Sequence, residues 1–190
     1  MDKLGVINFA LMKCGLPLAA ALSDCDYNAG LIFDNDALID LESHAWGFAQ
    51  KFAVLEQASV PPLFGKQYAY LRPPDCVRLI DVRLDKNLRA PKATFVKEGE
   101  RIYTDVSPCY ARYVWRCLNA EYWPAYFCDV VAAHIACDIA ALSAEKIALV
   151  PQLYQLYSAS LNRAMANDAR EETERVPLDD SLFAGRGRSA

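Results

Sequence analysis

The sequence predicts an α+β protein in which a mainly helical bundle brackets a small antiparallel β-sheet region and an extended C-terminal arm follows. Hydrophobic residues recur every three to four positions near both ends of the chain, alternate with polar residues in its middle third, and lose this period beyond Val176. The 190 residues are 54% hydrophobic, enough for the core of one ordinary domain. We expect that domain over residues 1–175 and the arm over 176–190.

Two helices are expected in the first third, over about 3–14 and 27–44. The first carries hydrophobic residues one turn apart and then a glycine stop: Leu4, Ile7, Leu11, Cys14 and Gly15. Ser23 or Asp24 is placed to cap the second helix, whose first amides need an acceptor. Its expected inward stripe is Leu31, Ala37, Leu38, Leu41 and Ala45, and its expected outer face carries Asp34, Asn35, Asp36, Asp40 and Glu42.

The middle third, about 47–117, predicts a small antiparallel sheet. A first strand, "FAQKFAVLE", is ended by Pro61 and Pro62. From Val77 the chain alternates with a two-residue period, which places Ile80, Val82 and Leu84 on one face and Asp81 and Arg83 on the other. A hairpin, "ATFVKEGERIYTD", has Glu98–Gly99 at its turn, and "YARYVWRC" continues as a strand.

The last third returns to helices, over about 124–144 and 151–173. Pro124 and Pro151 suit the first turn of a helix, where the missing amide hydrogen costs nothing. The inward residues expected on the last helix are Leu153, Leu156, Tyr157, Leu161 and Ala164.

Charge and hydropathy exclude two classes of partner. The net charge is −4, with basic residues scattered except in the tail "GRGR", whereas proteins that grip a nucleic-acid backbone show a basic excess or stripe. The longest apolar run, 130–142, is interrupted by His134 and Asp138 and is too short to span a bilayer. The N-terminus lacks the pattern of a secretory signal, so we expect a protein made and kept in a cytoplasm.

Seven irregularly spaced cysteines predict buried, reduced thiols. Their number is odd and no Cys-x-x-Cys occurs, while His44 and His134 are the only histidines. A zinc site needs four converging ligands, usually in closely spaced pairs. We therefore assign no metal or cofactor.

The stretch "YAYLRPPDCVRLIDVRL" poses a choice between an activated thiol and a turn. A reactive cysteine needs a neighbour that stabilises its thiolate, but Asp75 beside Cys76 would raise the pKa of the thiol. Arg78 lies two residues after Cys76, on the same face of the expected strand, which fits a surface pair. Pro73 and Pro74 keep the backbone extended before the strand begins. We interpret the segment as a turn into a strand.

The histidines allow a similar choice. His134 and Asp138 lie one turn apart, a spacing that suits a catalytic pair. Because no nucleophile or third group is evident, we interpret them as a buried hydrogen bond, and His44 as a partner of a helix end. No motif for nucleotide binding, ester hydrolysis or metalloprotease chemistry occurs, so no catalytic residue is assigned. Seven aromatics of the middle third are interpreted as cross-strand packing rather than base stacking: Tyr68, Tyr70, Phe95, Tyr103, Tyr110, Tyr113 and Trp115.

The ordered set of segments resembles the tail tubular protein A family, the head-to-tail adaptors of short-tailed bacteriophages. The likeness runs over about residues 3–172, through "LMKCGLPLAAALSD", "HAWGFAQ", "YAYLRPPDCVRLIDV", "FVKEGERIYTD", "YWPAYFCDVVAAHIACDIAALSAEK" and "AMANDAREE". It departs at Arg72–Pro73, where such proteins tend to have a small apolar residue before a single proline.

This resemblance implies a structural virion protein without catalysis. Such adaptors form a ring, usually of twelve subunits, between the portal above and the tail nozzle below, and genomic DNA passes through the central channel without sequence-specific binding. The expected location is the tail or neck of the virion, assembled in the host cytoplasm, with no membrane contact. The expected partner interface is the arm, which we expect to dock on the portal or a neighbouring subunit through Leu178, Leu182, Phe183, Arg186 and Arg188.

Two other functions stay open at this stage. A head-completion protein of a long-tailed phage shares the helical character, but those proteins are mostly helical and shorter. A small cytoplasmic enzyme would depend on Cys76 or on the pair of His134 and Asp138.

Overall fold

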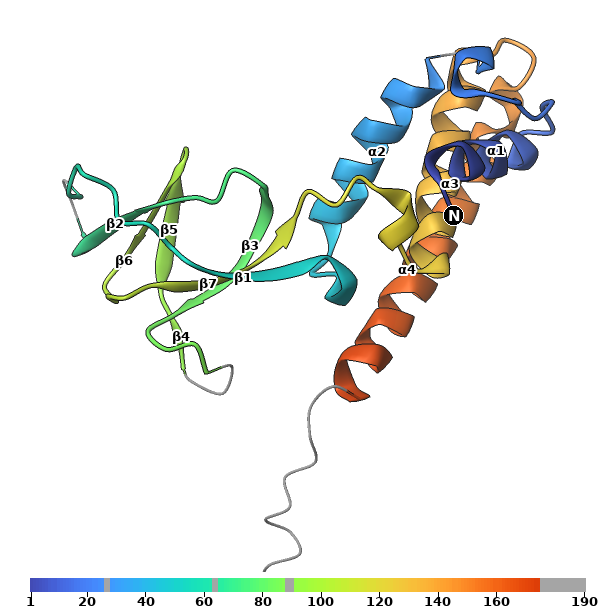
Figure 1. Ribbon diagram of the computed structural model, residues 1–190. Coiled ribbons are helices and arrows are strands. Elements are labelled where there is room, and N and C mark those ends of the chain that lie inside the picture. Colours follow the sequence, from blue (N-terminus) through green and yellow to red (C-terminus); the bar gives the residue numbers. More distant parts are fainter. Residues whose placement is uncertain (26–27, 63–64, 88–90, 175–190) are drawn as a thin grey trace, which may run out of the picture.

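The fold is α+β, as the sequence predicts. The computed structural model describes residues 1–25, 28–62, 65–87 and 91–174, so the arm lies outside the described residues. A helical bundle stands beside two small antiparallel sheets, and α4 runs on past the bundle (Figure 1). The helices of the bundle are α1 (Lys3–Lys13), α2 (Ala29–Ser43), α3 (Ala125–Leu142) and α4 (Val150–Glu174), joined by the short 3-10 helices η1 (Leu22–Asp24), η2 (Gly47–Ala49), η3 (Ala120–Tyr122) and η4 (Ile147–Leu149).

Helix α3 is the centre of the bundle. It is apolar on nearly every side and packs against α1, α2 and α4, as a helix without a polar face must. Among the described residues it is the one helix long and apolar enough to cross a membrane, and 61% of that 18-residue window is buried inside the fold. The apolar run judged too short in the sequence is therefore part of a longer helix that begins at Ala125, and its surroundings are those of a core helix.

The ends of the first two helices differ in how well they were predicted. Gly15 stops α1 with a φ of +65°, and the Leu16 N–H donates to the Leu11 carbonyl at 2.9 Å, which confirms the predicted stop. Helix α2 instead begins after Asn28, whose side chain makes no capping bond. The predicted cap is wrong, because Asp24 accepts from the Ala21 N–H at 3.0 Å within η1. Tyr27 lies outside the described residues.

The faces of two helices were partly mispredicted. On α2, Ala37 and Leu41 are buried as expected, but Leu31 is 72% exposed. Asp36 and Asp40, expected on the outer face, are buried at 1% and 0% exposure because that side of α2 faces the bundle, where Asp40 contacts His134 of α3 and Tyr157 of α4. On α4 the expected stripe is confirmed at Leu153 and Ala164 and wrong at Leu156, which is 37% exposed.

The middle third forms two sheets rather than the one expected. The four-stranded sheet has the order β1 (Gln50–Val54), β7 (Tyr110–Trp115), β3 (Cys76–Arg83) and β4 (Lys92–Ala93), and the three-stranded sheet has the order β2 (Tyr68–Leu71), β6 (Arg101–Thr104) and β5 (Phe95–Glu98). A small core lies between them, separate from the core of the bundle. In the predicted hairpin Glu98 pairs with Arg101, so the turn is Gly99–Glu100, one residue later than expected.

The expected alternation in β3 holds only in part. Irregularities in its pairing with β7 fall between Cys76 and Arg78 and between Leu79 and Asp81, and each shifts the side chains that follow. Val82 is buried in the small core, but Asp81 and Arg83 are buried too, on the opposite face. Leu84 lies beyond the strand and is 53% exposed.

Candidate functional site

The Asp75–Cys76 segment is a turn into β3. The Cys76 N–H donates to the Pro73 carbonyl at 3.0 Å, and Asp75 accepts from Lys51 Nζ at 2.8 Å and from the Tyr113 hydroxyl at 3.1 Å. Burial, at 3% exposure, raises the pKa of the Cys76 thiol, the opposite of what an activated nucleophile needs. The expected surface pair of Cys76 with Arg78 is wrong.

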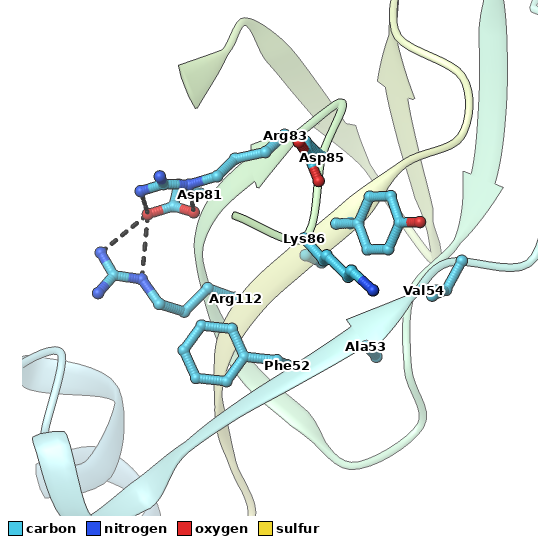
Figure 2. A pocket seen from close by; sticks show the side chains of 10 residues that line it. Phe52, Ala53, Val54, Asp81, Arg83, Asp85, Lys86 and Arg112 are labelled. Carbon is cyan, nitrogen blue, oxygen red and sulfur yellow. Dashed lines mark hydrogen bonds and ion pairs between the residues drawn. The ribbon is translucent and has the colours of Figure 1, made fainter. Parts of the chain in front are cut away.

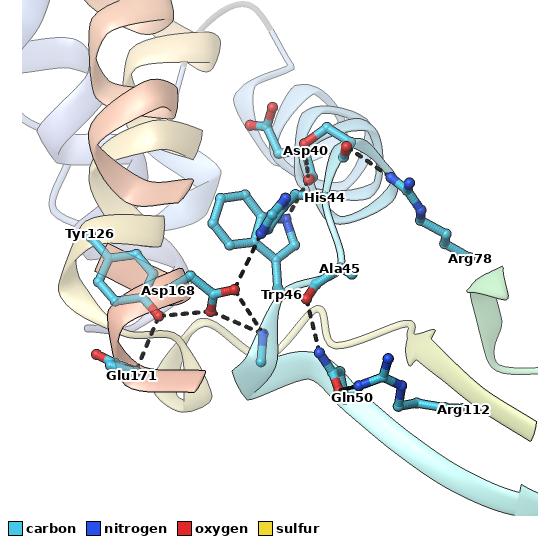
Figure 3. A network of polar contacts seen from close by, with 12 residues as sticks. Asp40, His44, Ala45, Trp46, Gln50, Arg78, Arg112, Tyr126, Asp168 and Glu171 are labelled. Atoms are coloured by element: carbon cyan, nitrogen blue, oxygen red, sulfur yellow. Dashed lines mark hydrogen bonds and ion pairs between the residues drawn. The ribbon is translucent and has the colours of Figure 1, made fainter. Parts of the chain in front are cut away.

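Arg78 instead holds the end of α2. Its Nη1 donates to the carbonyl oxygens of Glu42 and Ser43, each at 2.8 Å (Figure 3). The last carbonyls of a helix lack partners within the helix and carry its negative dipole end, so a guanidinium there both bonds and neutralises them. This contact ties β3 of the sheet to the bundle.

The cysteines lie where the sequence predicts. The seven cysteines, all among the described residues, form no disulfide; six are buried, and Cys25 is partly exposed. Burial raises the pKa of the buried thiols, to about 11 at Cys109 and at Cys137. These side chains serve as small hydrophobic groups in the two cores.

His134 makes a buried contact with an aspartate, but the predicted partner is wrong. Asp138 points to solvent, whereas His134 Nδ1 lies 3.3 Å from Asp40 Oδ2 across the helix interface. The Tyr157 hydroxyl of α4 donates to Asp40 Oδ1 at 2.7 Å, and its ring stacks on His134 at 4.5 Å between centroids. The cluster therefore links α2, α3 and α4 to one another.

Asp36 lies one turn before Asp40, and neither of its carboxylate oxygens has a hydrogen-bond partner among the residues that the structure describes. Burial raises its pKa to about 7; the positive charge of His134 and nearby Asn35 act in the lowering direction but are outweighed. Burial alone would lower the pKa of His134, but Asp40 and the other nearby carboxylates raise it. This cluster could not be predicted from local sequence patterns, because its members come from three helices.

A second buried carboxylate, Asp168 of α4, joins the bundle to the start of the sheet. Its oxygens accept from the Gly47 N–H at 2.9 and 3.2 Å and from the Tyr126 hydroxyl at 3.2 Å, and lie 3.3 Å from His44 Nε2 (Figure 3). His44 is the C-terminal cap residue of α2, as predicted, but its partner is this carboxylate. In the sequence analysis Asp168 stands only within the segment "AMANDAREE".

The outer face of the four-stranded sheet carries exposed apolar residues around an ion-pair cluster. Cross-strand partners share a face, which places Phe52, Arg112 and Asp81 in one row and Val54, Tyr110 and Arg83 in the next. Phe52 and Val54 are 58% and 63% exposed and border a concavity of about 450 Å³ (Figure 2).

Among the residues that line this concavity, Asp81 is held by two guanidinium groups. Arg83 Nε and Arg112 Nη2 lie 3.0 and 2.8 Å from its oxygens. Burial alone would raise the pKa of Asp81, but the hydrogen bonds and charges of these arginines hold it below its usual value. Arginine and aromatic residues around an exposed apolar patch are the composition of protein-binding hot spots.

Most of the aromatic residues of the middle third pack as predicted. Tyr70 and Tyr113 are buried in the small core, and Tyr68, Phe95 and Trp115 pack against it. The prediction is wrong for Tyr110, which lines the outer concavity, and Tyr103 lines a second surface hollow beside Val96.

The remaining sequence hypotheses concern ligands and the arm. Within residues 1–25, 28–62, 65–87 and 91–174, no group of three or more His, Cys, Asp or Glu side chains is placed to hold a metal ion. Leu178, Leu182, Phe183, Arg186 and Arg188 lie outside the described residues.

Neither the models of known protein families nor the curated proteins contain a match to this sequence.

Proposed function

We propose that the protein is a head-to-tail adaptor of a short-tailed bacteriophage, a structural subunit that forms a ring between the portal and the tail nozzle. The proposal starts from the ordered resemblance over residues 3–172. A bundle that brackets β-structure suits the division of labour that the resemblance implies, in which helices build the ring and the β-rich part meets the next tail component.

The observation that carries this proposal is a pair of exposed apolar faces on the bundle. Leu31 and Ile39 of α2 are 72% and 48% exposed, and Ile147 of η4 and Tyr154 of α4 are 59% and 62% exposed. Helix α2 lies along the side of the bundle next to the sheets, whereas the turn from α3 to α4 lies at the end of the bundle where α2 begins (Figure 1). Two unlike faces on one subunit are what a head-to-tail contact requires, and such contacts close into rings.

Charge supports a channel that does not hold DNA. Twelve copies at −4 each would carry about −48, which repels phosphate rather than binding it. DNA that must slide through the ring moves more easily when the channel wall attracts it only weakly. In this proposal the arm over 176–190 docks on the portal or a neighbouring subunit.

The double substitution Leu31→Glu with Ile39→Glu tests the ring. Each change places a charge in the expected contact and removes about 1.5–3 kcal/mol of apolar burial per interface, so we expect subunits of 21.2 kDa that no longer assemble on portal rings. Sedimentation velocity with and without portal measures this. Val96→Glu, at a position 53% exposed on β5, is the matched control and leaves the ring intact. Rings of normal size from the α2 variant would contradict the proposed contact.

A further inference from the structure

The outer face of the four-stranded sheet has the features of a peptide-binding surface. Strand β1 is the edge of its sheet, and within the described part of the chain no strand pairs with its other side. Such an edge offers backbone N–H and C=O groups to an extended segment. Phe52 and Val54 stand exposed along this edge, beside the concavity of about 450 Å³.

The charge around this concavity selects the kind of segment that fits. Its lining holds three basic side chains, Arg83, Arg112 and Lys86, against two acidic ones, Asp81 and Asp85, and Lys92 reaches within 3.8 Å of Asp81. Lys86 and Lys92 are exposed. An occupant should therefore present acidic residues next to apolar ones, so that charges meet the basic rim while apolar groups cover the exposed edge.

The chain contains such a segment in its own arm. The sequence "PLDDSLF", over 177–183, places Asp179 and Asp180 between Leu178 and the pair Leu182 and Phe183. The remainder of the arm, "AGRGRSA", is basic and lacks this pattern.

The end of α4 lies close enough for this segment to reach. Asp168 contacts Gly47 at 2.9 Å, so the last turns of α4 lie beside the residues that lead into β1. Glu174 is about 9 Å further along the helix, and Phe52 lies at most about 18 Å beyond Gly47 along the extended chain. With the contact itself, these steps sum to about 30 Å, and the nine residues from Glu174 to Phe183 also span about 30 Å when extended.

We propose that the segment over 177–183 docks on the outer face of β1 and β7 of the same chain. Phe183 covers Phe52 and Val54, and Asp179, which lies on the same face of an extended segment, faces the basic side chains of the concavity. The contact belongs to the free chain and does not require the ring. On assembly, the portal or a neighbouring subunit competes with the sheet for this segment. The arm therefore leaves the sheet only where such a partner surface is present.

Photochemical cross-linking of the full chain tests this docking. Phe183 is replaced by the photoreactive analogue p-benzoylphenylalanine, which keeps an aromatic ring at that position. Illumination of the dilute protein should join residue 183 to a peptide that contains residues 50–54 or 110–112, in a product that migrates as one chain. Peptide mass spectrometry identifies the joined residues.

Matched substitutions separate docking from chance contact. Phe52→Ser with Val54→Ser should lower the cross-link yield about tenfold, because two exposed apolar partners are lost, whereas Val96→Ser, on the other sheet, should leave it unchanged. Asp179→Lys with Asp180→Lys should also lower the yield, and Lys86→Asp should partly restore it. Three results would each overturn the proposal: cross-links that do not include the sheet, cross-links only between two chains, or a yield that the β1 substitutions do not change. Each of these results is independent of whether the protein forms rings.

Discussion

Replacing Asp36 by asparagine is expected to stabilise the protein at pH 8 and to flatten the dependence of its stability on pH. Both carboxylate oxygens of Asp36 are buried without a hydrogen bond to any described part of the chain, and burial raises its pKa to about 7. The unfolded chain ionises this group near its ordinary value, so folding takes up a proton between about pH 4 and pH 7. The stability contributed by the neutral acid is therefore full below pH 4 and lost as the pH rises to about 7.

The size of the effect follows from that window. Three pKa units correspond to a free-energy difference of at most about 4 kcal/mol. The asparagine amide would also be buried without hydrogen-bond partners, and its desolvation offsets part of the gain in stability. We expect a gain of about 1–3 kcal/mol for Asp36→Asn at pH 8 and little change at pH 4, measured by urea unfolding. His134, whose pKa is also raised, adds a slope of the same sign in both proteins, since its contribution fades as the pH passes above its folded pKa.

A carboxylate elsewhere on α2 provides the control. Asp34 has a side chain that is 45% exposed and accepts from Lys3 at 2.7 Å. Asp34→Asn should change stability by less than about 1 kcal/mol at either pH. A variant of Asp36 that unfolds more easily at pH 8, with the same slope as the parent, would show that the buried acid is not the source of the pH dependence.

Replacing Asp168 by alanine is expected to destabilise the protein by about 2–4 kcal/mol. The change leaves the Gly47 N–H, the Tyr126 hydroxyl and His44 without their shared acceptor (Figure 3). Because Gly47 leads into β1, the loss should appear first as faster hydrogen exchange in η2 and β1, where the sheet joins the bundle.

Glu171 is the matched control for Asp168. It lies one turn further along α4, is exposed, and meets the same Tyr126 hydroxyl at 3.4 Å. Glu171→Ala should cost less than about 1 kcal/mol and leave exchange in β1 unchanged. Equal effects of the two substitutions would mean that the junction does not depend on the buried carboxylate.

Local patterns were enough to predict most elements of the fold. The three-to-four period around Leu11 and Ala164 and the glycine at position 15 specify helices and a helix end from neighbours in sequence alone. The hairpin at Gly99 was predicted within one residue for the same reason. These features depend on contacts inside one element, so the sequence of that element contains the information.

The errors share a physical cause, which is contact between distant elements. Asp36 and Asp40 were expected on the outer face of the second helix because aspartate is usually solvated, but both are buried at 1% and 0% exposure, and Asp40 contacts groups of two other helices. The division into two sheets depends on which strands pair, and alternation does not determine that. Asp81 was expected on the polar face of its strand, yet it is buried, because Arg83 of the same strand and Arg112 of β7 neutralise it.

The mass of the assembled particle tests the proposed function most directly. Full-length protein is mixed with portal rings and examined by negative-stain imaging and by mass measurement of the complexes. The adaptor proposal predicts a second ring stacked on the portal, with a mass near twelve times the 21.2 kDa of one chain. Portal rings that stay bare while the protein remains as single 21.2 kDa chains would contradict it.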